Sequence, residues 1–163
     1  MGSTLTVDNI VGATTAANVK MPAGHIIQFV NVTSTTLHNH SSTSFTDTGF
    51  DATITPKYAT SKIFILGNFS IYLSGGSQNN LGELQIRRND VDVRAFMTVR
   101  QYDYGSSGVL IERPVTMVNL DSPATTSAVK YTLYTKARQG GGNIILNDDS
   151  DDFSTLTLME VAQ

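Results

Sequence analysis

Residues 62–74 constrain the fold most strongly, because their side chains alternate in character with a period of two. A period of two is typical of a β-strand that buries one face. One face of the expected strand is apolar or small throughout, with Ile63, Ile65, Gly67, Phe69, Ile71 and Leu73. The second face is only half apolar, with Phe64, Leu66, Asn68, Ser70 and Tyr72. The stretch therefore predicts a long strand with its first face in a core.

A second signal is a pair of strand-like segments, residues 81–88 and 91–98, separated by Asn89-Asp90. Asn and Asp tolerate the left-handed backbone that tight turns need, so we expect a hairpin. The polar residues 33–43 are expected to connect strands, and Pro114 to mark a bulge or a sheet edge. Turn residues bound the other predicted strands, which are residues 25–32, 44–50, 52–55, 109–120, 128–138, 143–146 and 153–161.

These segments amount to about eight to ten strands with no stable helix, a pattern typical of a sandwich or barrel. Eight strands with their loops need roughly 110 to 140 residues, which residues 25–163 provide. We predict an all-β fold, an antiparallel β-sandwich of jelly-roll-like topology. An immunoglobulin-like sandwich needs fewer strands than the sequence predicts. Residues 1–24 are predicted to form an extended N-terminal arm and a turn at Met21-Pro22-Ala23-Gly24, ahead of the head domain at residues 25–163.

The composition excludes several functional classes. Charged residues are 15% of the chain, against about a quarter in ordinary domains, and 21 Thr and 15 Ser take their place. The absence of Cys excludes disulfides, thiolate metal sites and a cysteine nucleophile, and fits folding in a reducing cytoplasm. A net charge of -3 argues against nucleic-acid binding. No apolar run reaches the roughly 18 residues of a membrane helix, and residues 1–11 do not resemble a signal peptide.

No motif predicts a catalytic residue. Asp47-Thr48-Gly49 is the tripeptide of aspartic proteases, in which two carboxylates share a proton. Its flanking residues do not fit, and a turn with Gly49 at positive φ is the favoured interpretation. The chain has no Gly-x-Ser-x-Gly elbow and no phosphate-binding loop. Alternation is expected to place Arg87 and Arg88 on opposite faces, so that they form no single basic patch.

Metal sites and cofactors are not expected. The acidic loop Asp148, Asp149, Asp151 and Asp152 lacks the spacing of a calcium loop, so a solvated loop is favoured and cation binding stays an alternative. His38 and His40 would share one face of a strand, but only His25 could add a third imidazole. Tyr102 and Tyr104 could stack on a sugar or pack over a sheet edge.

Three stretches resemble the virion surface proteins of tailed bacteriophages, particularly aquatic ones. Together they span the chain, and residues 154–161 resemble the closing strand of those proteins. The opening and the first head strands carry the rest of the resemblance, at residues 3–10, 21–28, 45–50, 54–56 and 61–63.

The resemblance implies a non-enzymatic virion protein with a trimeric jelly-roll head, either a capsid decoration (cement) protein or a tail-fibre head that recognises a host surface glycan. Only about 20 residues precede the head, too few for a fibre shaft, which favours decoration. The implied partners are two further copies and the major capsid protein, on the outer capsid surface of particles assembled in the bacterial cytoplasm. The arm is expected to dock through Leu5, Val7, Ile10 and Val11, and a host contact would involve Tyr102, Tyr104, Asn79, Asn80 and Asn143 in outward loops.

Overall fold

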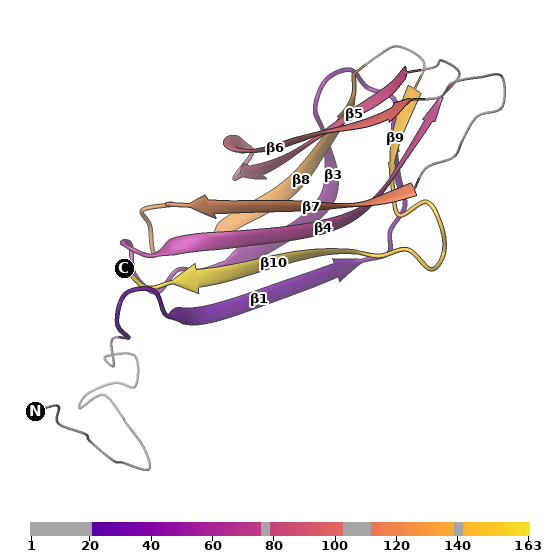
Figure 1. The fold of residues 1–163 in the computed structure, drawn as a ribbon. Helices are drawn as coiled ribbons and strands as arrows, with labels where there is room; N and C mark the ends of the chain where they lie inside the picture. Colours follow the sequence, from indigo (N-terminus) through magenta and orange to yellow (C-terminus); the bar gives the residue numbers. More distant parts are fainter. Residues whose placement is uncertain (1–20, 76–78, 103–111, 139–141) are drawn as a thin grey trace, which may run out of the picture.

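The computed structural model describes residues 21–75, 79–102, 112–138 and 142–163, and these residues form strands and no helix (Figure 1). The arm residues Leu5, Val7, Ile10 and Val11, predicted to dock on a partner, lie outside the described residues. The strands are β1 (Ile26–Ser34), β2 (His38–His40), β3 (Thr46–Ile54), β4 (Lys62–Gly75), β5 (Asn79–Arg88), β6 (Val91–Tyr102), β7 (Glu112–Asp121), β8 (Val129–Ala137), β9 (Gly142–Leu146) and β10 (Ser154–Val161).

The strands form two antiparallel sheets. Sheet A follows the order β1-β10-β4-β9-β2, with β7 also on β4, and sheet B follows β3-β8-β5-β6. One edge of β4 pairs first with β10 and then with β9, while β7 lies along its other edge. Since β1 pairs with β10 and β2 with β9, sheet A is four strands wide, with two of its four positions interrupted once.

The pairing is nested, which identifies the fold as a jelly roll. β5 pairs with β6, β4 with β7, β3 with β8 and β1 with β10, so the chain behaves as one long hairpin rolled into two sheets. The predicted all-β antiparallel sandwich of jelly-roll type is confirmed.

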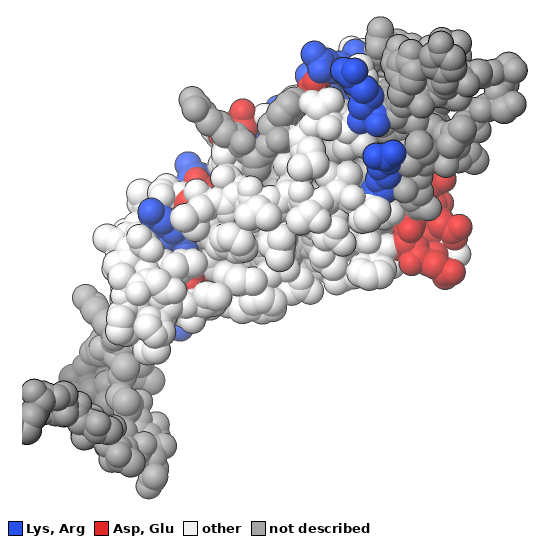
Figure 2. Space-filling model, viewed as in Figure 1, with Lys and Arg blue, Asp and Glu red and all other residues white. Residues whose placement is uncertain are grey.

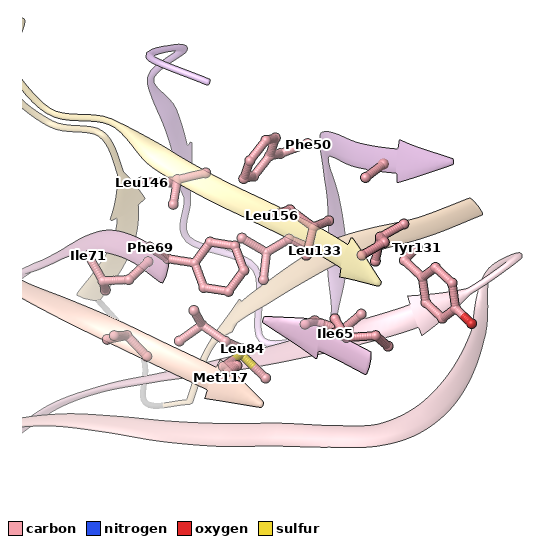
Figure 3. Close-up of a cluster of buried hydrophobic side chains, with 14 of the residues drawn as sticks. Phe50, Ile65, Phe69, Ile71, Leu84, Met117, Tyr131, Leu133, Leu146 and Leu156 are labelled. Carbon is pink, nitrogen blue, oxygen red and sulfur yellow. The ribbon is translucent and has the colours of Figure 1, made fainter. Parts of the chain in front are cut away.

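The core lies between the sheets, and β4 contributes most to it. Its predicted inward face is buried throughout, and the Phe69 ring meets Phe50 of β3 edge-to-face with centroids 6.1 Å apart (Figure 3). Gly67 is required by this packing, because a Cβ at that position would overlap the Phe69 ring. Leu133 and Tyr131 of β8 and Leu84 of β5 close the core from sheet B.

Several expected details are confirmed and others are wrong. Asn89 and Asp90 adopt φ of 46° and 68° in the β5–β6 turn, and β7, which carries Pro114, is an edge strand. The connection expected at residues 33–43 contains a strand, β2. Residues 44–50 and 52–55 are parts of one strand, β3, because Gly49 at φ 69° absorbs a register shift without ending the pairing with β8.

One side chain fastens the point where the two interrupted positions of sheet A, β1/β2 and β10/β9, both break. Asn147 is buried at φ 54°, and its amide nitrogen donates to the Ser34 and Thr36 carbonyls at 3.0 and 3.1 Å. Its amide oxygen accepts from the Ser154 hydroxyl at 2.7 Å. The break between β9 and β10 is thereby tied to the break between β1 and β2.

The sandwich has two unlike ends. At one end, called the terminal end, β1 begins and β10 finishes, and Gly24 and His25 exchange backbone hydrogen bonds with Ala162 (Figure 1). At the other end, called the loop end, the chain passes from β4 to β5, from β6 to β7 and from β8 to β9. Residues 76–78, 103–111 and 139–141 of these connections lie outside the described residues.

Candidate functional site

The outer face of sheet A brings together apolar side chains from four strands that are distant in the sequence. Register places Phe29 of β1, Met159 of β10, Phe64 of β4 and Leu120 of β7 in one row across the sheet. Leu66 and Val118 lie in the next row, and Ile26 and Val161 pair at the terminal end. We call this set the apolar face; it comprises Ile26, Phe29, Phe64, Leu66, Val118, Leu120, Met159 and Val161.

The apolar face is open to solvent in the single chain. Phe29 is 60% exposed, Val118 58% and Leu120 51%, and Phe64, Leu66 and Met159 are half-buried. Figure 2, drawn from this side, shows few charged side chains over the four strands. Monomeric proteins rarely leave such a contiguous apolar surface uncovered, so this face has the character of a contact surface.

The outward positions beyond the apolar face are polar and uncharged. Asn31 and Thr157 lie in the second row and share a hydrogen bond of 2.7 Å between the Thr157 hydroxyl and the Asn31 amide oxygen. Thr33, Thr155, Asn68 and Thr116 form the third row. Past this band, a group of acidic side chains lies at the loop between β9 and β10 (Figure 2).

The outer face of sheet B is built differently, from groups that satisfy one another. The Glu83 carboxylate is only 5% exposed and lies 2.6 Å from Lys136 Nζ and 3.3 Å from Arg138 Nε. The Arg87 guanidinium lies over the Tyr134 ring at 4.2 Å, and Lys136 Nζ lies 4.6 Å from the centroid of Phe45.

Neighbouring groups extend this arrangement. The Tyr134 hydroxyl donates to Asp90 at 2.8 Å, and burial together with that carboxylate raises the pKa of Tyr134. Arg88 instead binds Asp121 at 2.7 Å, and the Tyr131 hydroxyl donates to the same carboxylate. The different partners of Arg87 and Arg88 confirm that they form no single basic patch.

A shallow groove lies where the loop between β9 and β10 meets sheet A. It has a volume of about 360 Å³ and is lined by Asn68, Ser70, Pro114, Asp151, Asp152 and Phe153. The Phe153 side chain is 56% exposed, so an aromatic face and two carboxylates border one open space. The acidic loop is ordered partly by its own contacts, since Asp149 N donates to an Asp152 carboxylate oxygen at 3.3 Å.

His38 and His40 share one face of β2, as the alternation predicts, with ring centroids 6.4 Å apart. Nδ1 of His40 is 3.0 Å from the Thr135 hydroxyl of β8. Burial lowers the pKa of both imidazoles, and His40 lowers that of His38 further, while Asp47 acts in the opposite direction on both. Within the described residues no group of three His, Asp or Glu side chains is placed to hold a metal ion.

Two further carboxylates have structural partners. Asp47 accepts from Gly49 N at 2.7 Å, so the Asp-Thr-Gly tripeptide closes on itself at the bulge of β3. Glu160 is fully buried, and its Oε1 accepts from the backbone N–H groups of Lys57 and Tyr58 at 2.8 and 3.2 Å. These bonds hold the β3–β4 connection against the terminal end.

The residues expected at a host contact are placed at the loop end, partly in strands. Asn79 and Asn80 open β5, where Asn79 pairs with Tyr102 at the end of β6, and Asn143 is half-buried in β9 opposite Ser74. These four therefore belong to strands, where loops were expected. Tyr104 lies outside the described residues.

The apolar face was not found from the sequence. The one local signal is the second face of β4, which was described as only half apolar and whose apolar members Phe64 and Leu66 belong to this surface. The other members become neighbours only through strand register.

No family model matches the chain, and no curated protein matches it in sequence. Among solved structures, dimeric latent PorU from Porphyromonas gingivalis matches with a TM-score of 0.35 at 10% identity, covering 88% of this chain and 14% of that one. The VP2 subviral particle of infectious bursal disease virus matches with a TM-score of 0.35 at 14% identity, covering 83% of this chain and 38% of that one. The chain thus spans well under half of each structure. Likeness at this level assigns no function.

The described part of the chain contains no helix with the length and hydropathy needed to span a bilayer.

Proposed function

We propose that the protein is a non-enzymatic structural component of a phage virion, a trimeric capsid decoration protein that docks on the outer shell and reinforces it. The sequence resemblance to virion surface proteins of tailed phages suggests the class. The fold is compatible with it, since jelly rolls occur in viral capsid proteins as well as in lectins, but fold alone does not decide function.

The observation that carries the proposal is the contrast between the two ends of the sandwich. Residues 1–20 join the described chain at Met21, beside the last strand, so both chain ends leave from the terminal end. Fully extended, 20 residues reach at most about 65 to 70 Å, so the arm can extend from the head onto a neighbouring shell subunit. A head held from this end presents its loop end outward.

Docking in this manner would reinforce the shell by mass action. A protein that binds the assembled shell and not the free subunits shifts the equilibrium toward the shell. The docking contacts are assigned to Leu5, Val7, Ile10 and Val11 of the arm and to the major capsid protein.

Copy number tests the proposal directly. Gel densitometry of purified virions should give a number of copies comparable to that of the shell protein. A few copies per particle would place the protein in the tail and overturn the decoration role.

Arm deletion tests the docking route. A variant lacking residues 1–20 should stay folded and trimeric but no longer bind particles stripped of the protein. A full-length variant with Leu5, Val7, Ile10 and Val11 changed to Ser should behave alike, because it removes the apolar contacts and keeps the length. Full occupancy by either variant would assign docking to the head instead.

A second candidate function, recognition of a host surface glycan by a tail-fibre head, is favoured by the groove at Phe153. An exposed aromatic ring can stack on a sugar, and carboxylates such as Asp151 can accept its hydroxyl hydrogens. Selective signals on a glycan array should fall for Phe153→Ala, or for Tyr102→Ala and Tyr104→Ala. Leu37→Ala, at a side chain 53% exposed, is the matched control and should leave them unchanged.

A further inference from the structure

The apolar face of sheet A requires an occupant, and we propose that further copies of this chain cover it, each contributing its own apolar face. This deepens the proposed function by naming the surface through which the copies meet. It rests on that function only for the number of copies, which is three. The arm remains free to reach the shell.

The size of the face suits a subunit contact. Four strands about 4.8 Å apart, rising about 3.3 Å per residue, make an outer surface roughly 19 Å by 33 Å over the length of β7, on the order of 600 Å² in projection, of which the apolar face takes about half and the polar rows take the rest. β7 has 10 residues. A standard interface buries about 800 Å² per partner, so the apolar face and the polar rows beside it together approach what one stable contact needs.

The chemistry of the face suits a copy of itself better than a partner of defined charge. On the outer face of sheet A, Lys62 lies at the terminal end and Glu112 at the loop end of the strands. Between these two ends, the outward positions of β1, β10, β4 and β7 hold no charged residue. Identical surfaces meeting here encounter no like-charge repulsion. The flanking Asn31, Thr157 and Thr116 carry amides and hydroxyls that both donate and accept, so they can hydrogen-bond to polar groups of a neighbouring copy.

The position of the face also fixes how the copies are arranged. Its apolar rows lie toward the terminal end, and the acidic loop Asp148–Asp152 lies at the far side of the polar band. Copies packed through their apolar rows around a threefold axis along the strands all point the same way. Every terminal end, and every arm, is then on one side of the assembly.

Sedimentation of the purified full-length protein, across low to high micromolar concentrations, tests this without any virion. The wild type should sediment as a homo-oligomer, three times the 17.6 kDa chain if the proposed function holds. Val118→Asp should give monomers, with a dissociation constant raised at least about a hundredfold, because the contact would bury an unpaired carboxylate. Circular dichroism should show the variant folded, since Val118 points outward.

Val91→Asp is the matched control, because Val91 is 64% exposed, against 58% for Val118, and lies at the β5–β6 turn. It should sediment like the wild type. A wild type that is monomeric throughout, with the face covered by its own arm or reserved for the shell protein, overturns the inference; so does a Val118→Asp variant that stays oligomeric. Oligomers that fail to bind particles would contradict the proposed function and leave this inference standing.

Discussion

The two sheets share one core but differ on their outer faces. Sheet B covers its outer side with its own charged and aromatic groups, so that Glu83, Lys136 and Arg87 all have partners within the chain. Sheet A presents Phe29 and Leu120, which the described residues leave more than half exposed, beside further apolar side chains. The difference is that the groups on the outer side of sheet B satisfy one another within the single chain, whereas the outer side of sheet A has the character of a contact surface, which we propose further copies cover.

The largest expected effect belongs to neither face, since the core supports both sheets. Phe69→Ala should lower the free energy of unfolding by about 3–5 kcal/mol, because Phe69 is fully buried against Phe50 and Gly67. Urea unfolding measures the loss. The exposed Phe153→Ala should change stability by less than about 0.5 kcal/mol; equal losses would contradict the described core.

On the outer face of sheet B, Glu83→Gln should lower the free energy of unfolding by about 1–3 kcal/mol, because Lys136 and Arg138 lose a buried carboxylate. Chemical denaturation at low protein concentration isolates the effect from assembly. Asp148→Asn, in the exposed acidic loop, is the control. An unchanged free energy of unfolding for Glu83→Gln would mean that the ion pairs on the outer face of sheet B do not stabilise the chain.

A smaller effect is expected where β2 of sheet A contacts β8 of sheet B. The folded-state pKa values of His38 and His40 lie below their ordinary value near 6.5, so the folded state binds fewer protons than the unfolded state. The stability is therefore fully present above about pH 6.5 and declines as the pH falls through the lowered values. Melting temperatures between pH 8 and 5 should show this decline, and a His38→Gln, His40→Gln variant should reduce it.

The smallest expected effect lies on the apolar face. Leu120→Thr should change the unfolding free energy of the dilute monomer by less than about 0.5 kcal/mol, since the side chain is 51% exposed. At high concentration the wild-type melting temperature should rise with protein concentration, and that of the variant should rise less. A large loss in the dilute monomer would show that Leu120 supports the fold of the single chain.

Local patterns were sufficient to predict the elements that carry their own signal. The alternation in β4 predicted its buried face, and Asn89-Asp90 predicted the β5–β6 hairpin. β2 was missed because three residues within a polar stretch have no period, and its strand character depends on pairing with β9. The break at Gly49 was taken for the end of a strand, since a bulge and a turn use the same residue types.

The candidate surface was harder to predict for a related reason. Phe29 and Met159 are separated by most of the chain, and each is unremarkable among its sequence neighbours. Their adjacency is a property of the β1–β10 register, which only the complete pairing scheme defines. The arm residues and Tyr104 stay predictions.

The nested pairing has a consequence for the order of folding. The β5–β6 hairpin is local, whereas Asn31 and Thr157 are 126 positions apart, so closing the β1–β10 pair carries the largest chain-entropy cost. We expect structure to spread from the hairpin outward, with amides of β1 protected last in pulsed hydrogen exchange. Phe29 and Met159 would meet only in that final step. A ribosome-bound chain would thus lack the surface through which we propose that finished chains associate, and synthesis would be separated from premature association.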